Sequence, residues 1–551
     1  MIGLSSGRLP SVMSHSFSRV PQAQIPRALF SRSHGHKTTF DAGYLVPIYV
    51  DEALPGDTFN LRMTAFARMA TPLYPIMDNL YLDSHFFAVP MRLIWNNWEK
   101  FCGAQTDPDD STDFTVPVMT APAVTGHVVG SLSDYMGIPT GIADLEHNSV
   151  WHRAYNLIWN EWYRDQNLQD SLVVDLDDGP DSSTDYVLKR RGKRHDYFTS
   201  CLPWPQKADE AVQIPLGTSA PVYGPGLVTN TSNAALWQLW NQTDNVVNTA
   251  GLDKTSGAGV NADWNAVSGS LTGDNTQVAQ LATAAQYTAA GSGFSPPIAD
   301  LSAATAATIN SLRLAFQTQK LLERDARGGT RYTEIVRSHF GVTSPDARLQ
   351  RPEFLGGGTT MVNVTPIPNT SNTDTGTLGA TGTVTASGHG FIKSFTEHCL
   401  LIGLVSVRAD LNYQQGLNRM FSRQTRLDYY WPALAHIGEQ AVLNKEIYAQ
   451  NDANDDLVFG YQERYAEYRY KPSLITGQFR STYATPLDAW HLAQEFSALP
   501  TLGDTFIQEN PPMARVQAAS GEVSFIFDSY MDLKCARPMP VFSVPGLIDH
   551  F

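Results

Sequence analysis

The stretch FNLRMTAFARM, residues 59–69, alternates apolar and polar side chains with a period of two. The apolar side chains occupy the odd positions, namely Phe59, Leu61, Met63, Ala65, Ala67 and Met69. Successive side chains of a strand point to opposite faces, so this pattern predicts a β-strand with one face in a core and one in solvent. Residues 80–89 form a second candidate strand, ended by Pro90. Residues 523–535 form a third, with Val523, Phe525 and Phe527 on one face.

Three segments predict helices instead. Residues 93–101 place Ile94, Trp98 and Phe101 on one stripe, and Ser149 is a candidate cap for a helix in which aromatic residues recur at helical spacing. Residues 303–327 repeat apolar side chains in the same way before Gly328 and Gly329 supply a stop. The chain therefore combines alternating strands with helical segments.

The composition favours a protein that is covered by partners. Apolar residues make up 42% of the 551 residues, aromatic residues 11%, and charged residues only 17%, against about a quarter in typical domains. Aromatic side chains favour interfaces. A surface this poor in charge suits a protein that packs against copies of itself.

Changes in amino-acid composition and sequence pattern divide the chain into four parts. Residues 1–40 are predicted to be an extended basic arm, and residues 41–207 the first part of the β core with helical insertions. Residues 208–300 are a folded surface insertion, rich in small residues but containing Trp237, Trp240 and Trp264. Residues 301–551 complete the core, with an exposed loop over 356–390 and an extended C-terminal tail.

The charges are unevenly distributed. The net charge of −15 excludes a generally nucleic-acid-binding surface. Residues 1–40 nevertheless carry no acid and five basic residues, which are the candidate nucleic-acid-facing residues Arg8, Arg19, Arg27, Arg32 and Lys37. Residues 107–185 carry fifteen acidic residues against Arg153 and Arg164. This asymmetry suits a shell with an inside and an outside.

The segment RHDYFTSCLPWPQK, residues 194–207, joins a basic cluster to a rigid corner. Pro203 and Pro205 fix the backbone around Trp204, so this piece is predicted to shape a surface or a contact. Because Arg can clamp carboxylates, the acidic stretch of a neighbouring subunit is a candidate partner. The candidate inter-subunit residues here are Lys189, Arg190, Arg191, Lys193, Arg194 and Trp204.

The stretch RDARGGTRY, residues 324–332, resembles a phosphate-binding loop only superficially. It lacks the preceding strand, and its glycines are predicted to end a helix. We therefore interpret Arg324, Arg327 and Arg331 as further inter-subunit contacts. RYAEYRY, residues 464–470, permits base stacking, but its Glu residues favour a subunit contact.

No segment carries a recognisable catalytic or cofactor motif. The four cysteines, Cys102, Cys201, Cys399 and Cys535, are far apart and indicate neither a zinc site nor a disulfide scaffold. The acidic turn around Gly179 fails the calcium-loop spacing. We predict no enzyme activity, no cofactor and no metal site. The longest apolar run, residues 399–407, is too short to span a bilayer, so no membrane insertion is expected.

Long segments of the chain resemble the major capsid proteins of the microviruses, in their gokushovirus branch. They include the residue 14–59 segment beginning SHSFSRVPQAQIPRALF, RAYNLIWNEWYRDQN at 153–167, RHDYFTSCLPWPQK, and ERDARGGTRYTEIVRSHFGV at 323–342. RPEFLGGG at 351–358, the 387–450 run containing SFTEHCLLIGLVSVRADLNYQQGLNRMFSRQTRLDYYWPALAHIGEQ, YQERYAEYRYKPS and CARPMPVFSVPG complete the set. Matches are weakest in 208–300 and 359–386.

The resemblance implies a mainly β fold, namely a single eight-stranded viral jelly roll with large loop and helical insertions. It further implies about 60 copies in a T=1 icosahedral shell around a circular single-stranded DNA genome. The expected partners are the chain itself, a small basic DNA-binding protein, other virion and scaffolding proteins, and a bacterial surface receptor. The expected location is the virion, assembled in the host bacterial cytoplasm.

Two other functions stay open from the residues alone. A phage spike or adhesin that binds glycans or a receptor would use the insertion 208–300, which is also the candidate three-fold protrusion of a shell. Its tryptophans, Trp237, Trp240 and Trp264, are the candidate host-recognition residues. An enzyme would need acids and histidines brought together by folding, and no segment indicates one.

Overall fold

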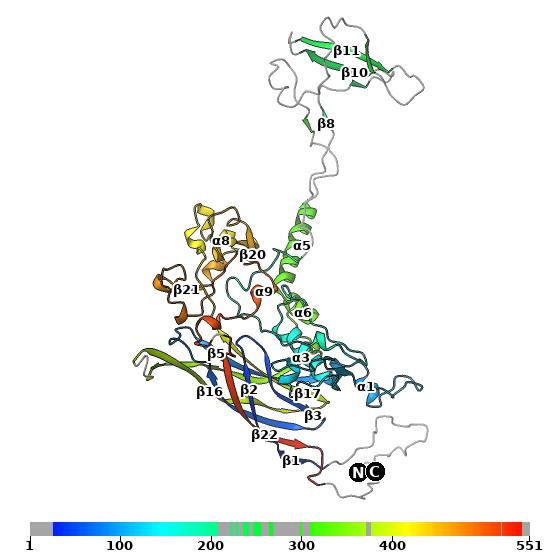
Figure 1. Cartoon of the computed structure of the whole chain (residues 1–551). Helices are drawn as coiled ribbons and strands as arrows, with labels where there is room; N and C mark the ends of the chain where they lie inside the picture. The colour runs from blue at the N-terminus through cyan, green and yellow to red at the C-terminus, as the bar shows by residue number, and fades with distance from the viewer. Residues whose placement is uncertain are drawn as a thin grey trace, which may run out of the picture. The chain divides into compact units, whose positions relative to one another are not determined.

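Two antiparallel β-sheets carry the core of the protein (Figure 1). The computed structural model describes residues 26–207, 309–370, 376–519 and 521–542, together with short strands between residues 222 and 299. The chain divides into two compact units, residues 1–207 with 323–551 and residues 208–322.

The first sheet joins the two ends of the chain. Its order is β1-β22-β4-β16-β15, and β2 lies beside β22 as well. The strands are β1 (Ala28–Ser31), β2 (His34–Phe40), β4 (Thr58–Met69), β15 (Asn363–Pro368), β16 (Leu378–Ser394) and β22 (Phe525–Arg537). Because β22 pairs with β2 on one side and β4 on the other, the last strand of the chain lies inside the sheet.

The second sheet has the order β14-β5-β17-β3. Its strands are β3 (Val46–Ala53), β5 (Leu80–Pro90), β14 (Glu353–Met361) and β17 (Cys399–Ala409). The chain passes repeatedly between the sheets, and the order β2-β22-β4-β16 against β3-β17-β5-β14 is that of a jelly roll. This confirms the predicted fold class.

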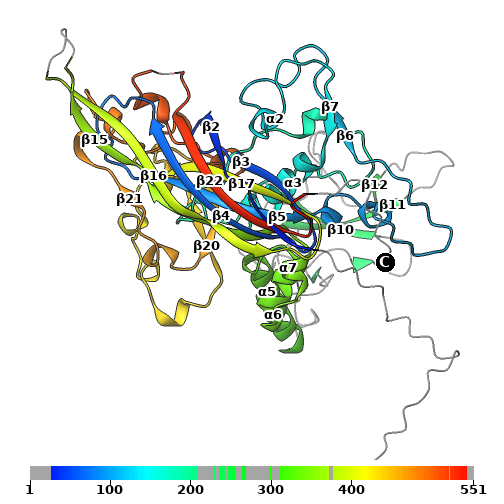
Figure 2. The same ribbon diagram turned by 90° about the horizontal axis from the view of Figure 1, so that it is seen from below.

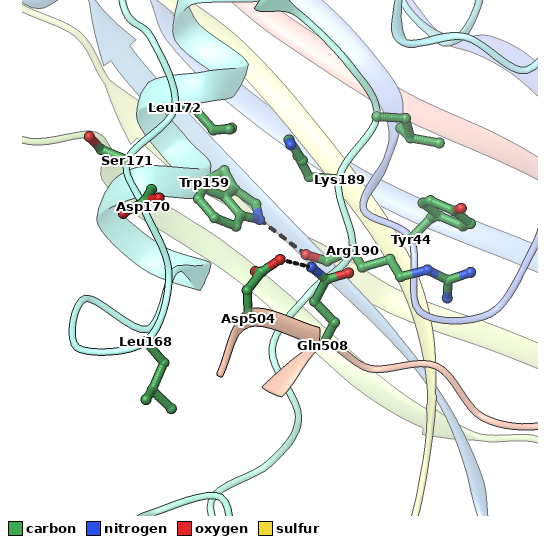
Figure 3. A pocket seen from close by; sticks show the side chains of 11 residues that line it. Tyr44, Trp159, Leu168, Asp170, Ser171, Leu172, Lys189, Arg190, Asp504 and Gln508 are labelled. Atoms are coloured by element: carbon green, nitrogen blue, oxygen red, sulfur yellow. Dashed lines mark hydrogen bonds between the residues drawn. The ribbon is translucent and has the colours of Figure 1, made fainter. Parts of the chain in front are cut away.

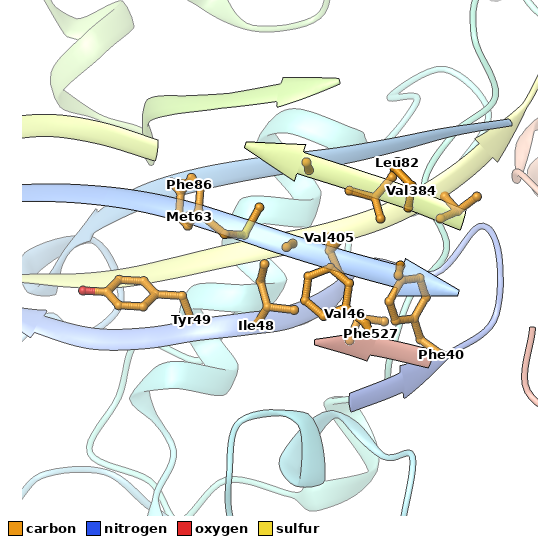
Figure 4. Packing of buried hydrophobic residues seen from close by; sticks show 14 of the residues in the cluster. Phe40, Val46, Ile48, Tyr49, Met63, Leu82, Phe86, Val384, Val405 and Phe527 are labelled. Atoms are coloured by element: carbon orange, nitrogen blue, oxygen red, sulfur yellow. The ribbon is translucent and has the colours of Figure 1, made fainter. Parts of the chain in front are cut away.

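The main core lies between the two sheets (Figure 4). All six odd-numbered apolar side chains of β4, from Phe59 to Met69, are buried in it, whereas Arg62, Thr64, Phe66 and Arg68 are exposed. The period-two prediction for residues 59–69 is therefore confirmed. The strand predicted over 80–89 is β5, and β22 buries Phe525 and Phe527 as predicted while Val523 precedes the strand.

A second core covers the other face of the second sheet. Every residue of β17 is buried, because its two faces contribute to different cores. Helix α3 (Val150–Ile158) packs on this face through Ala154, Tyr155 and Ile158 and continues into a π-helical turn at Trp159–Tyr163. The insertion between β5 and β14 thus closes the sandwich on one side.

A third core lies between the long connection that joins β17 to β22 and residues 197–201 of the insertion between β5 and β14. Tyr197, Phe198 and Cys201 pack there against Val442, Ile447 and Phe459. The short elements of this region are β18 (Asn412–Tyr413), β19 (Glu439–Leu443), α8 (Asn444–Ile447), β20 (Val458–Glu463), β21 (Ser473–Leu474) and α9 (Asp504–Ile507). The front half of the 194–207 segment is therefore core rather than surface, and Trp204 is half-buried.

The remaining elements of the first unit are short. They are α1 (Trp98–Phe101), β6 (Val118–Thr120), α2 (Leu132–Tyr135), β7 (Glu146–Asn148), α6 (Tyr332–Phe340) and α7 (Asp346–Leu349). Within the described residues, no helix is both long and apolar enough to cross a membrane.

The second unit begins at residue 208, as the predicted insertion does, and ends at 322. It contains a sheet of order β12-β11-β10-β9, made of β9 (Val228–Thr229), β10 (Ala235–Asn241), β11 (Val246–Lys254) and β12 (Trp264–Val267). Strands β8 (Val222–Tyr223) and β13 (Ile298–Ala299) pair with each other, and in the sequence β8 precedes this sheet and β13 follows it. Helix α5 (Ile309–Arg327) crosses the unit boundary and ends before Gly328, as predicted.

Four local predictions were wrong. The helix expected over 93–101 is a 3₁₀ turn at Met91–Leu93 and a short α1, and the side chains of Trp95 and Asn97 between them donate hydrogen bonds to Asp178. Ser149 precedes α3 without a side-chain cap. The loop expected over 356–390 contains β14, β15 and β16 in the described residues.

The fourth concerns the arm. Residues 28–40 form β1 and β2, whose backbone groups pair with β22 at the sheet edge, so the extended arm does not reach residue 40. Residues 1–25 lie outside the described residues, as does the tail from residue 543.

Candidate assembly surface

Exposed aromatic side chains gather on one part of the connection between β17 and β22. We call these residues the aromatic patch: Met420, Phe421, Leu427, Tyr429, Tyr430, Trp431, Ile437, Tyr468 and Tyr470, each more than a third exposed. Scattered exposed apolar residues are ordinary, but a contiguous group marks an interaction site. Tyr, Trp, Phe, Met and Arg are also the residue types that are enriched at interfaces.

Short capped turns hold the aromatic patch in place. The Asn418 side chain accepts a hydrogen bond from the Met420 backbone nitrogen at 3.0 Å, and Asp428 accepts one from Thr425 at 2.7 Å. Pro432 begins a third 3₁₀ turn. Because polar groups of the same segment satisfy the turns, the apolar side chains are left pointing outward.

Arginines stack on the rings of the aromatic patch. The guanidinium of Arg426 lies 4.5 Å from the centroid of the Trp431 ring, and that of Arg423 lies 4.3 Å from that of Tyr468. Arg423 also forms a 3.1 Å ion pair with Glu467, and both side chains are buried. These contacts preorganise the rings, which reduces the entropy lost when a partner binds.

A buried carboxylate fixes the base of this region. The Tyr197 hydroxyl donates to Glu446 Oε2 at 2.8 Å, and Arg419 donates to Glu446 Oε1 at 2.9 Å. Burial raises the pKa of Glu446 although Arg419 opposes the shift. The 194–207 segment therefore supports this region through the hydrogen bond from Tyr197 to Glu446.

The predicted basic cluster is largely engaged within the chain. Arg190 stacks over Tyr44 at 4.0 Å, and Arg191 forms a 2.6 Å ion pair with Asp83. Lys193 is buried, donates to Gln494 at 3.0 Å, and its pKa falls to about 8 because of that burial. Their role in inter-subunit contact stays a prediction.

The other members of that cluster are more accessible. Arg194 is exposed and lies 4.0 Å from Asp410, and Lys189 and Trp204 are half-buried. These three are the cluster residues best placed to meet a neighbour.

A hollow with a volume of about 410 Å³ lies beside the basic cluster (Figure 3). Trp159 donates to the Arg190 carbonyl at 3.0 Å, and Gln508 donates to Asp504 at 2.8 Å across its wall. Lys189 also lines it. Because these polar groups form hydrogen bonds with one another, we interpret the hollow as a recess for packing rather than as a binding site for a charged ligand.

The arginines near the glycine pair also have partners in the chain. Arg327 forms ion pairs with Glu439 and Glu463, and Arg331 pairs with Glu161 at 2.6 Å. Arg324 is exposed on α5. Gly329 adopts a positive φ of 99°, which agrees with the predicted helix stop.

The structure places three of the five predicted nucleic-acid-facing residues. Arg32 forms a 2.7 Å ion pair with Asp51, and Arg27 donates to Thr58 at 3.0 Å. Lys37 is largely exposed and lies 3.9 Å from Asp528. Arg8 and Arg19 lie outside the described residues.

The predicted host-recognition tryptophans lie on strands of the second unit. Trp237 and Trp240 are on β10 and pair with Ala250 and Val247 of β11, and Trp264 of β12 pairs with Lys254. Their side chains are outside the described part of the structure.

The sequence interpretation missed two groups of residues. One is the part of the aromatic patch between residues 420 and 437, although the run RLDYYWPALAHI already combined aromatic residues with a proline; Tyr468 and Tyr470 lie in the segment 464–470, which was predicted to be a subunit contact. The other is Asp83, which pairs with both Arg191 and Arg408 and had no local signal. Among the described residues, no cluster of three or more metal-ligating side chains is present.

Comparisons with known proteins match nearly the whole chain to viral capsid proteins. The family model for capsid protein (F protein) matches residues 18–547. Capsid protein VP1 of Bdellovibrio phage phiMH2K is 47% identical over 553 residues, covering 98% of both chains. Capsid protein VP1 of Chlamydia phage 1 is 45% identical, covering 99% of this chain and 100% of the relative. Capsid protein VP1 of Spiroplasma virus 4 is 36% identical, covering 97% of both.

Proposed function

Because the chain belongs to the phage capsid protein (F protein) family, we propose that about 60 copies close a T=1 icosahedral shell around a single-stranded DNA genome. The family role is structural rather than enzymatic, and the protein assembles with itself into the virion.

The aromatic patch is the observation that carries it. Closed shells need repeated contacts between different surfaces of identical subunits, and permanent interfaces of this kind are large and apolar. The patch supplies exposed rings on a preorganised base, with Arg426 and Trp431 at its surface. An isolated subunit would leave these rings in water.

The genome contact needs a partner. About 60 arms with five positive charges each give roughly 300 charges, whereas a genome of a few thousand nucleotides carries about one phosphate per nucleotide. Arg32 is moreover already paired with Asp51. A small basic DNA-binding protein, with polyamines or metal cations, would therefore supply most of the neutralising charge.

The second unit is the proposed protrusion at the three-fold axes and the proposed receptor contact. Its support is the presence of Trp237, Trp240 and Trp264 on its strands. Deletion of residues 208–300 followed by measurement of phage adsorption tests this, and unchanged adsorption would contradict it.

Electron microscopy of the purified full chain tests the proposed function. We expect closed particles of one diameter with icosahedral symmetry. A spike or adhesin would instead give small oligomers with no shell, and that result would overturn the proposal.

The arm is tested by deletion of residues 1–25, which leaves β1 and β2 intact. We expect a folded subunit that gives fewer full particles than the whole chain. A normal yield of full particles would show that the arm is dispensable.

A further inference from the structure

No described helix covers the outer face of the first sheet (Figure 2). Its inner side packs into the main core, and Figure 2 views the sheet from the other side, with no described helix in front of β22, β4 and β16. Side chains that point outward alternate with the buried ones along each strand. Those exposed on β4 and β22 are Arg62, Thr64, Phe66, Arg68, Ile526, Asp528, Tyr530 and Lys534.

This outer face is basic although the whole chain carries a net charge of −15. Its cations are Lys37, Arg62, Arg68 and Lys534, and its acids are Asp528 and Asp532. Lys37 lies near Asp528. Within the described part of the chain, neither the Arg62 side chain nor the Arg68 side chain has an ion-pair or hydrogen-bond partner, although Asp532 stands opposite Arg62 on β22. The guanidinium groups of Arg62 and Arg68 can therefore bind an anionic partner.

Aromatic rings lie between these cations. Phe66 is 43% exposed and is separated from Arg68 by one inward-facing residue of β4. Tyr530 is 55% exposed and stands opposite Thr64 on the neighbouring strand. The two rings thus occupy adjacent strands on one face.

Hydroxyl groups border the rings on the other side. Thr383, Thr385 and Ser387 of β16 stand opposite Arg68, Phe66 and Thr64. Ser and Thr side chains contact phosphate oxygens in nucleic-acid complexes. The distance along β4 from Arg62 to Arg68 is roughly 20 Å, which gives room for a few nucleotides.

We propose that this sheet face binds single-stranded DNA, with bases on Phe66 and Tyr530 and phosphates on Arg62 and Arg68. The proposal rests on the proposed function, since it assigns the genome of the shell to one surface of the subunit. Single strands offer free bases for stacking on aromatic residues, and Arg contacts their backbone. A second protein copy would have to place a carboxylate against each guanidinium, or else bury it unpaired.

Fluorescence anisotropy of a labelled oligothymidylate with the full-length unassembled subunit tests the proposal. We expect Arg62→Gln/Arg68→Gln to weaken binding at least tenfold and to reduce the slope of log affinity against log salt by about 1.4, since two phosphate contacts are lost. Phe66→Ser is expected to weaken binding about tenfold without changing that slope.

The matched control is Arg348→Gln/Lys471→Gln, which removes the same net charge from exposed positions elsewhere. It is expected to leave the affinity unchanged. Equal losses in both double variants, no binding by the whole chain, or duplex binding as tight as single-strand binding would each overturn the proposal. So would a defect of Arg62→Gln/Arg68→Gln in DNA-free assembly with normal DNA binding, which would identify a protein partner.

The two proposals fail separately. If the whole chain forms no shell by electron microscopy, the proposed function fails whatever the anisotropy shows. If shells form but the face variants bind DNA normally, only the assignment of this face fails.

Discussion

Arg153 and Asp181 form an ion pair in which both side chains are completely withdrawn from solvent. Arg153 Nε donates to Asp181 Oδ2 at 2.7 Å, and the Tyr186 hydroxyl donates to the same oxygen at 2.8 Å. Burial alone would raise the pKa of Asp181, but the hydrogen bonds from Arg153 and Tyr186 outweigh it and lower that pKa. The pair fixes the insertion that carries α3 against the second sheet.

Arg153→Met should therefore strongly destabilise the subunit. It leaves the Asp181 carboxylate buried without its cation, and removal of one partner of such a pair costs about 3–5 kcal/mol. Urea unfolding of the unassembled subunit measures this. Arg153→Met/Asp181→Asn should recover part of the loss, and a single variant as stable as the parent chain would contradict the assignment.

Acid should destabilise the subunit through His152. This side chain is buried against Ser133, His147 and Tyr186, and burial lowers its pKa to about 3, with His147 and His127 adding to the shift and Asp181 opposing it. In the unfolded chain the pKa of His152 is about 6.5, so below that pH the unfolded state binds a proton at His152 that the folded state does not bind. Stability is complete above pH 6.5 and falls toward pH 3, by about 2 kcal/mol at pH 5.

His152→Gln tests this dependence. The free energy of unfolding should change less between pH 7 and pH 5 in this variant than in the parent chain. His195→Gln, at an exposed position, is the control and should keep the full dependence. An identical pH profile for His152→Gln and the parent would refute the role of His152.

The two faces of β4 should respond differently to truncation. Leu61 is 1% exposed, so Leu61→Ala should cost about 2–5 kcal/mol through lost burial and the cavity left behind. Thr64→Ala, on the exposed face of the same strand, should stay within about 0.5 kcal/mol. Urea unfolding of both variants provides the comparison, and equal costs would be inconsistent with the alternation.

Shell formation should depend on the aromatic patch. Phe421 and Leu427 are 70% and 62% exposed, so Phe421→Ser/Leu427→Ser removes contacts with a neighbour and leaves the fold intact. We expect the subunit concentration needed for half-assembly to rise roughly tenfold or more, since buried apolar anchors dominate interface energy. Light scattering measures this concentration.

Leu474→Ser is the matched control, because Leu474 is 70% exposed but lies on β21 outside the patch. Its assembly should match that of the parent chain. Normal assembly of Phe421→Ser/Leu427→Ser would show that the patch faces solvent in the shell.

The sequence predicted the strands whose pattern is local. In β4 the apolar residues alternate, and in β5 they are nearly continuous, so the local sequence pattern predicts burial directly. The predicted positions of both strands were therefore correct. The strands β14 and β16 were missed because their glycines resemble loop residues. Those glycines allow close strand approach: a Cβ on Gly357 would lie 2.0 Å from the Ser84 carbonyl oxygen, and one on Gly382 would lie 2.8 Å from Met69 Cβ.

The candidate site was harder to predict because its partners are distant in sequence. Arg191 pairs with Asp83, and Lys193 with Gln494, so charges that suggested a contact with a neighbour are used within the subunit. The aromatic patch shows the opposite: only its 464–470 part was predicted to be a subunit contact, and the folded chain adds the exposed residues between 420 and 437 to it.

The position of β22 has a consequence for synthesis on the ribosome. Residues 525–537 lie between β2 and β4, which are made nearly five hundred residues earlier, so those early strands must wait until residue 537 has been made to find their common neighbour. Contacts so remote along the chain also slow folding. A nascent polypeptide that has not yet reached residue 537 therefore has no strand between β2 and β4, and its first sheet stays incomplete.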